Sequence, residues 1–346
     1  MKVRVLGGGW FGCHIAATLI RDGHDVVLHE TRDRLFGGAS GNNPARLHIG
    51  CHYPRSHATR AACQQHFRGF MAEYGHLTRC VRTNLYAIAE SHSLVDFETY
   101  RSILRGEIEF ITVDDPTEYG LRSVEGAMLV RERHIIIDDA REHFSQLLGD
   151  AVALSTDKAG PVDSRDYDMT VDCTFCAKDS AGIDRYEPCL VVLLKGPTDT
   201  AVTIMDGPFP SVYPWNEEAG LCSLSSARYT PFSKQCGTMQ QAQWVLDGLK
   251  ASEVRAQAER MMGSMATFYP AVHDLYEIAD CRLSIRAMPL SAADTRLVDL
   301  VRVGDRAVRI RAGKIDAIMH AAEMVRGELM RQEQPQAETM ISAGRT

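Results

Sequence analysis

A glycine-rich turn lies between two short apolar segments at the start of the chain. The apolar run Val3–Leu6 leads into Gly7-x-Gly9-x-x-Gly12, and a helical stretch and a second apolar run, Val26–His29, follow. This order predicts a strand, a helix and a second parallel strand, which together form the βαβ unit of dinucleotide-binding folds. Gly7 allows the tight turn, Gly9 lets the backbone approach a pyrophosphate, and Gly12 lets the helix pack on the strand.

The same unit predicts a set of ligand contacts. The helical stretch that follows the turn, Cys13–Arg21, presents backbone N–H groups at its N-terminus, where phosphates bind, and Trp10 and Phe11 lie within the turn. Glu30 follows about 20 residues beyond the turn, where it can accept hydrogen bonds from a ribose diol. The predicted dinucleotide contacts are Gly7, Gly9, Trp10, Phe11, Gly12 and Glu30.

Composition narrows the class of protein. The chain has 346 residues, of which 45% are hydrophobic and 24% are charged, as is ordinary for a globular enzyme of one large or two smaller domains. The net charge of −7 argues against broad electrostatic binding to nucleic acid or anionic membranes. No apolar run approaches the roughly 20 residues of a membrane span. The ten scattered cysteines are typical of reduced thiols, so we expect a cytoplasmic protein without membrane partners.

Hydrophobic periodicity divides the rest of the chain into helices and strands. We expect helices over residues 57–75, 139–148, 238–266 and 314–330, and strands over 85–89, 108–113, 127–130, 168–174 and at several places between 187 and 226. A block rich in antiparallel strand signals therefore interrupts the nucleotide-binding unit. The expected fold class is α/β, with a Rossmann-type domain interwoven with an antiparallel-sheet α+β substrate domain.

Domain boundaries follow from this order. The predicted nucleotide-binding domain comprises residues 1–78, 134–180 and 281–335. The predicted substrate domain comprises residues 79–133 and 181–280, and residues 336–346 are expected to form a flexible tail.

A dense group of hydrogen-bond donors follows the first βαβ unit. Arg46, His48, His52, Tyr53 and Arg55 lie within ten residues of one another. Several donors at one place suit an anionic ligand, such as a phosphate or a substrate carboxylate. A lone histidine is usually a packed or surface residue, but this combination predicts a binding or catalytic site.

Two other segments carry residue types that occur in functional sites. Residues 209–215 are aromatic, and Tyr213 could contact a ligand or belong to the hydrophobic core. Cys173-x-x-Cys176 has the spacing of a metal or dithiol site, but no second motif pairs with it. We therefore expect no metal site.

Four segments together resemble one family. They are the glycine turn with Glu30, the small polar loop 39–43, the strand 167–174 and the segment 311–314 ahead of the last helix. In this combination the chain resembles the FAD-dependent oxidoreductases related to D-amino-acid oxidase, glycine oxidase and sarcosine oxidase. The resemblance is strongest over residues 3–60, fair over 167–174 and weaker over 282–330. It implies that the Rossmann-type domain binds FAD, and we expect non-covalent binding, with Cys51 and His48 as possible covalent anchors.

The resemblance also assigns cofactor contacts. The polar loop would lie near the pyrophosphate and the flavin, and Thr174 would end a strand that approaches FAD, although Phe175 stands where the family has glycine. The segment 313–315 would place a helix N-terminus near the flavin carbonyl, where positive charge stabilises the reduced flavin. The implied contacts are Ser40, Asn42, Asn43, Thr174, Gly313, Lys314 and Ile315.

Substrate contacts are implied in the same way. Ser284–Pro289 resembles the family's Arg-Pro segment, whose arginine holds the substrate carboxylate, although proline follows three residues after Arg286. The candidate catalytic residues are His48, His52, Tyr53, Arg55, Tyr213 and Arg286. The implied reaction is FAD-dependent oxidation of the C–N bond of an amino acid or N-substituted glycine to an imine, whose hydrolysis releases an amine and a carbonyl compound.

Three alternatives remain open at this point. One is the same chemistry on glycinyl-thymidine in phage DNA, a hypermodification lyase reaction that leaves aminomethyl-deoxyuridine, in which case the protein would work in the host cytoplasm. Another is an NAD(P)-dependent dehydrogenase, because the N-terminal unit alone permits it. The last is a non-catalytic FAD-binding subunit. The sequence leaves the electron acceptor and the oligomeric state undetermined.

Overall fold

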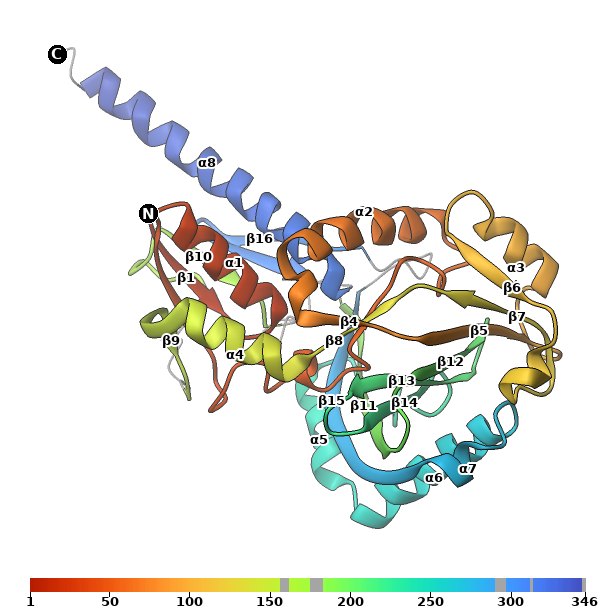
Figure 1. Cartoon of the computed structure of the whole chain (residues 1–346). Coiled ribbons are helices and arrows are strands. Elements are labelled where there is room, and N and C mark those ends of the chain that lie inside the picture. The colour runs from red at the N-terminus through yellow and green to blue at the C-terminus, as the bar shows by residue number, and fades with distance from the viewer. Residues whose placement is uncertain (156–161, 175–182, 290–296, 312–313, 344–346) are drawn as a thin grey trace. The chain divides into compact units, whose positions relative to one another are not determined.

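The chain divides into two compact units that alternate along the sequence. The computed structural model describes residues 1–155, 162–174, 183–289, 297–311 and 314–343. The first unit comprises Met1–Gly37, Arg141–Asp179 and Arg296–Thr346, and the second comprises Gly38–Ala140 and Ser180–Thr295 (Figure 1). This division differs from the predicted domain boundaries mainly at residues 38–78, which pack within the second unit.

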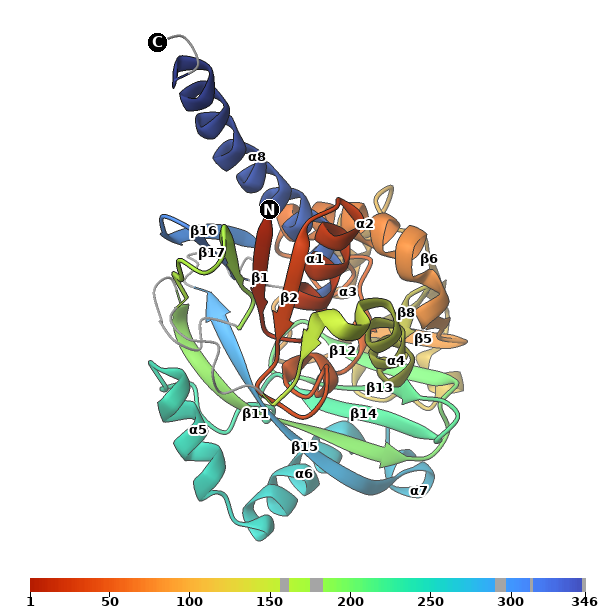
Figure 2. The ribbon, with the colours of Figure 1, turned by 90° about the vertical axis from the view of Figure 1, so that its left-hand side faces the viewer.

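The first unit is built on a six-stranded sheet with strand order β16-β17-β10-β1-β2-β9. Its strands are β1 (Lys2–Leu6), β2 (Asp25–His29), β9 (Val152–Ala153), β10 (Met169–Asp172), β16 (Asp299–Gly304) and β17 (Ala307–Arg311). Strand β1 pairs in parallel with β2, beside which it lies in Figure 2, and with β10; β10 in turn pairs in parallel with β17. The predicted βαβ unit is therefore confirmed.

Buried apolar residues hold this unit together. Val3 and Val5 of β1 are fully buried, as expected for a parallel strand covered on both faces. Helix α1 (Trp10–Arg21) packs against β1, β2 and α8 (Ile318–Ala343), which follows the short helix η5 (Ile315–Ala317). The Trp10 ring contacts Phe36 edge to face at 5.0 Å and Phe144 of α4 (Ile137–Leu148) at 5.6 Å between ring centroids.

The second unit contains an eight-stranded sheet with strand order β15-β11-β14-β13-β12-β5-β7-β6. Its strands are β5 (Thr83–Ala89), β6 (Phe110–Val113), β7 (Val124–Val130), β11 (Ile183–Lys195), β12 (Thr200–Met205), β13 (Pro210–Asn216), β14 (Leu221–Ser226) and β15 (Glu277–Pro289). All its strand pairs are antiparallel except β12 with β5, which pair in parallel. The predicted antiparallel α+β unit is thus present.

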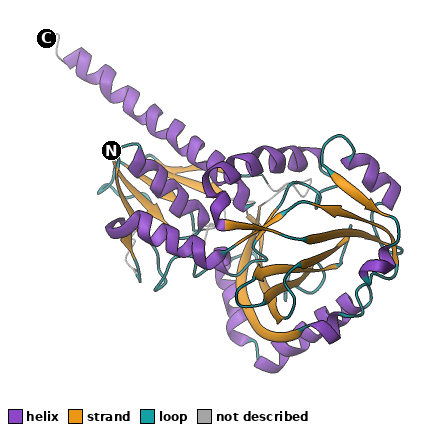
Figure 3. Ribbon diagram, viewed as in Figure 1, coloured by secondary structure: helices purple, strands orange, loops and turns teal. Residues whose placement is uncertain are grey.

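Shorter elements complete the second unit. A three-stranded sheet has the order β3-β8-β4, with β3 (Arg46–Leu47), β8 (Arg133–Ile135) and β4 (Thr78–Cys80). The helices of the second unit are α2 (His57–Tyr74), α3 (Phe97–Leu104), α5 (Met239–Gly248), α6 (Ala251–Ala266) and α7 (Val272–Leu275) (Figure 3). Its short helices are η1 (Ala39–Gly41), η2 (Gly75–Leu77) and η3 (Pro116–Tyr119). In the first unit, the short helix η4 (Gly149–Ala151) follows α4.

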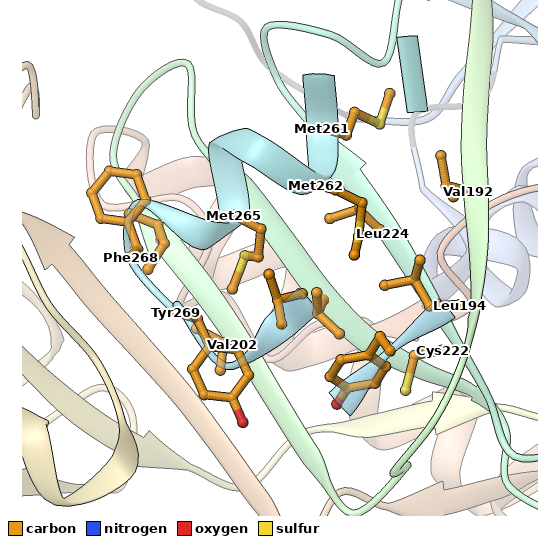
Figure 4. Close-up of a cluster of buried hydrophobic side chains, with 14 of the residues drawn as sticks. Val192, Leu194, Val202, Cys222, Leu224, Met261, Met262, Met265, Phe268 and Tyr269 are labelled. Atoms are coloured by element: carbon orange, nitrogen blue, oxygen red, sulfur yellow. The ribbon is translucent and has the colours of Figure 1, made fainter. Parts of the chain in front are cut away.

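One face of the eight-stranded sheet is apolar. Side chains alternate between the faces of a strand, so Leu85 of β5, Val202 of β12 and Leu224 of β14 lie in one buried cluster. Met262 and Met265 of α6 pack against them (Figure 4). This cluster forms the main core of the second unit.

Two predicted helices have different bounds in the structure. The helix predicted over 238–266 is two helices, because α5 ends at Gly248 and the Lys250 N–H donates to the Glu253 carboxylate at the start of α6. The last helix continues to Ala343, beyond residue 330 and into the segment expected to be a flexible tail. Glutamine, glutamate and alanine are frequent in that extension, residues 331–343, and favour a helix. Among the helices that the structure describes, none is long and apolar enough to span a bilayer.

Candidate functional site

The glycine turn between β1 and α1 leaves no room for side chains. Gly7 has φ +98°, and a Cβ atom there would lie 2.9 Å from the Cys173 carbonyl oxygen. A Cβ atom on Gly12 would lie 1.9 Å from the Gly7 carbonyl oxygen. Both positions therefore require glycine, for a left-handed backbone at Gly7 and for close helix–strand packing at Gly12.

Glu30 closes the turn from the other side. Its Oε2 accepts a hydrogen bond of 2.7 Å from the Gly8 N–H, and its Oε1 accepts one of 2.9 Å from the Arg32 N–H. Gly9 stands at the N-cap of α1 and brings no side chain to the helix N-terminus. The turn thus presents a narrow, glycine-lined cradle at a helix N-terminus, with a buried acid beside it. This arrangement fits the ADP half of a dinucleotide.

The polar loop around η1 is held by its own amides. Asn42 donates to the Gly38 carbonyl at 3.0 Å. Asn43 accepts from the Ala45 N–H at 2.7 Å and donates to the Ala39 and Ser40 carbonyls at 2.9 and 2.8 Å. These contacts fix the loop conformation, and the loop lies within the second unit.

The remaining predicted cofactor residues lie in the first unit. The Thr174 hydroxyl donates to Asp172 Oδ1 at 2.6 Å, and Asp172 Oδ2 forms a buried ion pair with Arg309 at 2.8 Å. Lys314 is the N-cap of η5, with Nζ 3.8 Å from Asp316, and Ile315 is the first residue of that helix. Gly313, Phe175 and Cys176 lie outside the described residues.

The second face of the eight-stranded sheet is polar although it is buried. Tyr86 of β5, Thr203 of β12 and Ser211 of β13 stand side by side in one cross-strand row. In the adjoining row, Asn84 of β5 pairs with Ala201 of β12. Tyr213 of β13 contacts Ala201 and belongs to the same row. We call these two rows the polar face. All these side chains are less than 10% exposed.

Arg46 of β3 lies on the polar face. Its guanidinium carbon is 4.0 Å from the centroid of the Tyr213 ring, which is a cation–π contact. Its Nη2 donates to Ser211 Oγ, which in turn lies 2.9 Å from Thr203 Oγ1. Its Nε is buried and has no hydrogen-bond partner among the described residues. Arg46 is therefore held in place by neutral groups and keeps hydrogen-bonding capacity for a ligand.

Glu132 is a buried carboxylate beside these residues that the sequence prediction missed. It is 1% exposed, its Oε2 accepts from the Tyr86 hydroxyl at 2.6 Å, and its Oε1 accepts from the Ile49 N–H at 3.0 Å. Burial alone would raise the pKa of Glu132, but His48, Arg46 and the Tyr86 hydroxyl together lower it to about 2. Glu132 therefore carries a buried negative charge. In the sequence, the one indication of its burial was its position between the apolar runs 127–130 and 135–137.

The structure brings three predicted site residues together, and one of them, His48, faces this carboxylate. His48 Nδ1 lies 3.6 Å from Glu132 Oε1, within ion-pair range. The ring centroids of His48, His52 and Tyr53 are 5.1 to 5.8 Å apart. These three residues and Arg46 form one cluster with Glu132.

The other two predicted arginines lie in ion pairs of their own. Arg55 Nε lies 2.5 Å from Asp206 Oδ2. Arg286 of β15 donates to Glu187 of β11 at 3.0 Å, and Glu187 is 1% exposed. A carboxylate of the chain itself therefore neutralises the charge of each guanidinium. Tyr213 is fully buried under Arg46, and burial raises the pKa of its hydroxyl well above the ordinary value.

Comparisons with known proteins agree with this geometry. Residues 2–154 match the family model DAO, described as FAD dependent oxidoreductase. The chain is 34% identical over 331 residues to "FAD-dependent monooxygenase FPY4" of Fusarium mangiferae, covering 93% of this chain and 89% of the relative. It is 27% identical to "FAD-dependent monooxygenase kojA" of Aspergillus flavus, covering 94% of this chain and 85% of the relative.

Solved structures share the fold. Glycine oxidase from Geobacillus kaustophilus superposes with a TM-score of 0.66 at 16% identity, covering 93% of this chain and 91% of that one. NikD, titled an unusual amino acid oxidase essential for nikkomycin biosynthesis, superposes with a TM-score of 0.67 at 13% identity, covering 93% and 91%. The predicted fold, cofactor and enzyme class are thereby confirmed, and neither an NAD(P)-dependent dehydrogenase nor a non-catalytic subunit fits these relatives. The chain belongs to the DAO family of FAD-dependent oxidoreductases.

Proposed function

We propose that this enzyme oxidises the C–N bond of a small amino acid or N-substituted glycine. Bound FAD supplies the two-electron acceptor for the hydrogen that leaves the carbon next to nitrogen. The resulting imine reacts with water and yields a carbonyl compound and an amine. We further propose that FAD is bound non-covalently. Cys51 is fully buried, and burial raises the pKa of its thiol well above the ordinary value, which makes it a poor nucleophile.

The observation that carries this proposal is the state of Arg46. Among the described residues it makes no direct ion pair, its contact partners Ser211 and Tyr213 are neutral, and Glu132 interacts with it only through the charge interaction that lowers the pKa of Glu132. A guanidinium held in this way suits the carboxylate of an amino acid, which it can bind through two parallel hydrogen bonds. Arg55 and Arg286 are less suitable for this role, because each guanidinium already pairs with a carboxylate of the chain. Arg55 pairs with Asp206, and Arg286 pairs with Glu187.

The histidines and Tyr53 would then surround the amino group of the substrate. A positioned carboxylate group fixes the orientation of the substrate, and a fixed orientation accounts for much of the rate enhancement in such reactions. We propose that His48, His52 and Tyr53 supply the polar contacts near the reacting carbon, and that the turn at Gly7–Gly12 with Glu30 holds the ADP half of the cofactor.

A second candidate is insertion of oxygen into the same kind of substrate. The relatives from Fusarium mangiferae and Aspergillus flavus carry the name monooxygenase, and the first is 34% identical to this chain. Glycinyl-thymidine in DNA remains a narrower candidate for amine oxidation, because a glycine attached to a base keeps the carboxylate that Arg46 would bind. The net charge of −7 does not favour a DNA substrate.

The decisive experiment is anaerobic addition of substrates to the FAD-loaded enzyme. Glycine, N-methylglycine, iminodiacetate, larger amino acids and a glycinyl-thymidine oligonucleotide are mixed with the protein, and loss of flavin absorbance is followed. Amine oxidation predicts that at least one of them bleaches the flavin without oxygen and releases an amine. A product that gains one oxygen atom from ¹⁸O₂ when NADPH is supplied as the two-electron reductant, with no bleaching by the substrate alone, would instead support the monooxygenase candidate.

A further inference from the structure

A buried carboxylate beside a histidine is the strongest feature of the second unit that the proposed function leaves unexplained. Glu132 precedes β8 and is almost completely inaccessible, yet it is ionised and accepts hydrogen bonds from Tyr86 and Ile49. An isolated buried charge is costly, so its compensation by several donors indicates a specific role.

The geometry around Glu132 assigns separate partners to its two oxygens. Oε2 accepts from the Tyr86 hydroxyl at 2.6 Å, while Oε1 accepts from the Ile49 N–H at 3.0 Å and lies 3.6 Å from His48 Nδ1. The Ile49 backbone and the His48 side chain are consecutive in sequence, so one carboxylate oxygen fixes both the main chain and the ring. The side chain of His48 is 16% exposed, whereas that of Glu132 is inaccessible.

This arrangement has a chemical consequence for His48. A negative oxygen at 3.6 Å attracts an N–H and repels a lone pair, so it favours the ring form in which Nδ1 carries the proton. The lone pair is then on Nε2. The same charge also stabilises the imidazolium that forms when Nε2 takes up a proton.

We propose that Glu132 is a positioning residue that sets the tautomer of His48 and makes it the general base for the substrate ammonium group. This inference rests on the proposed function, because an amino acid binds as an ammonium ion and must lose a proton before its C–N bond is oxidised. The balance is simple. His48 Nε2 accepts one N–H proton from the ammonium group, and the nitrogen regains its lone pair. Bound FAD would then serve as the acceptor of the hydrogen and both electrons of the adjacent C–H bond.

Other charged and titratable groups lie near this pair. Glu132, His52 and Tyr53 face His48, and Arg46 lowers the pKa of Glu132 from the β3 side. The Arg46 charge opposes a proton on His48, and the Glu132 charge favours it. Of these two charges, the Glu132 carboxylate is the one in direct ion-pair range of the ring, with its Oε1 3.6 Å from His48 Nδ1.

The test measures the ring nitrogens of His48 directly. Protein labelled with ¹⁵N-histidine is titrated by NMR with its FAD bound, and the His48 signals are assigned by their loss in His48→Gln. In the wild-type protein we expect the Nδ1–H form of the neutral ring. In Glu132→Gln, which keeps the size of the side chain but removes its charge, we expect the titration midpoint to move by about one pH unit or more to lower pH.

Kinetics provide the second measurement. In Glu132→Gln, kcat/KM should fall about 100-fold and the acidic limb of its pH profile should move to lower pH, since general-base catalysis of this kind contributes about 10²- to 10⁴-fold. Glu132→Asp keeps the charge and should recover part of the rate. Tyr86→Phe removes the donor on Oε2 alone and should have a smaller effect.

The controls separate the possible failures. Glu328→Gln removes another buried glutamate, one that pairs with Arg302 and Arg331 in the first unit, and should leave the His48 titration unchanged. If Glu132→Gln does not fold, Glu132→Asp and Tyr86→Phe carry the test. An unchanged His48 titration in the folded Glu132→Gln variant overturns the proposal. If no amine bleaches the flavin, the proposed function fails, while the titration still decides whether Glu132 governs His48.

Discussion

The two faces of the eight-stranded sheet share one backbone but use it differently. On one face, Leu85 lies in one buried cluster with Val202, Leu224 and the methionines of α6, and contacts of this kind depend on volume and shape. On the other face, Tyr86, Thr203 and Ser211 are equally buried, but each has a specific hydrogen-bond partner. The first face stabilises the unit, and the second holds charged groups in fixed positions. The comparison separates residues whose substitution should affect folding from residues whose substitution should affect catalysis.

The largest expected effect comes from Arg46 on the polar face. Arg46→Ala should lower kcat/KM for an amino-acid substrate about 100- to 1,000-fold, mainly through KM, because a charge-assisted bidentate contact to the carboxylate is lost. Steady-state kinetics measure this, with Arg255→Ala as control, since Arg255 forms an exposed ion pair with Glu259. A change of less than threefold in Arg46→Ala would show that another group binds the carboxylate.

The apolar face should respond in the opposite way. Met265 is fully buried in the core cluster, and Met265→Ala should lower the free energy of unfolding by about 3 kcal/mol, within the range of about 2–5 kcal/mol for such truncations. Urea denaturation measures this loss. Substrate KM of the folded enzyme should stay unchanged, and Trp244→Ala, at an exposed position, should change stability by less than about 0.5 kcal/mol. A large KM change in Met265→Ala would contradict the separation of the two faces.

Acid should lower the stability of the second unit through His134 of β8. Burial, with Arg79 and Arg133 nearby, lowers the pKa of His134 to about 4. In the unfolded chain His134 takes up a proton below about pH 6.5, whereas in the folded chain it does so only below about pH 4. The free energy of unfolding therefore falls as the pH drops from about 6.5 to 4 and levels off below that. The loss should approach about 3 kcal/mol. Denaturation of His134→Leu between pH 7 and 4 should show a shallower slope than that of the wild type, and equal slopes would refute the assignment.

His14 in the first unit provides a comparison for that measurement. Burial, with Arg21 and Arg326 nearby, lowers its pKa to about 4 as well. His14→Leu should therefore remove a second, separate part of the acid sensitivity, and the two substitutions should add because they lie in different units.

The smallest expected effect is a gain in stability. Asn84 is 1% exposed, and neither its amide oxygen nor its amide nitrogen has a hydrogen-bond partner among the described residues. Asn84→Leu should raise the free energy of unfolding by about 1 kcal/mol, because an unsatisfied buried amide is costly, and it should lower kcat/KM severalfold if the amide contacts substrate. Asn43→Leu, which removes three hydrogen bonds, should instead destabilise the protein. Loss of stability in Asn84→Leu would indicate a partner for the amide.

Local patterns in the sequence were sufficient for the nucleotide-binding turn. The glycines, the flanking strands and Glu30 lie within thirty residues, and their geometry follows from backbone sterics. The strands of the apolar face were also predictable, because alternation of apolar residues reports burial on one side.

The polar face could not be predicted in the same way. Arg46 and Ser211 are 165 residues apart, and Ile49 and Glu132 are 83 residues apart. Glu132 stands between two arginines in the sequence, a context typical of a surface strand. Its burial depends on partners that only the fold brings together. The same holds for Arg286, whose contact with Glu187 appears only when β11 and β15 pair.

The interleaving of the two units constrains how the protein is made. Strand β1 comprises Lys2–Leu6, but its neighbour β10 begins at Met169, and β17 begins at Ala307. A nascent chain on the ribosome therefore has no complete first sheet until β17 has emerged. During that time the apolar surfaces of β1 and α1 have no final partners, so chaperones that bind exposed apolar segments should engage the chain early. Premature termination even near residue 300 would leave the cofactor cradle without a finished sheet to support it.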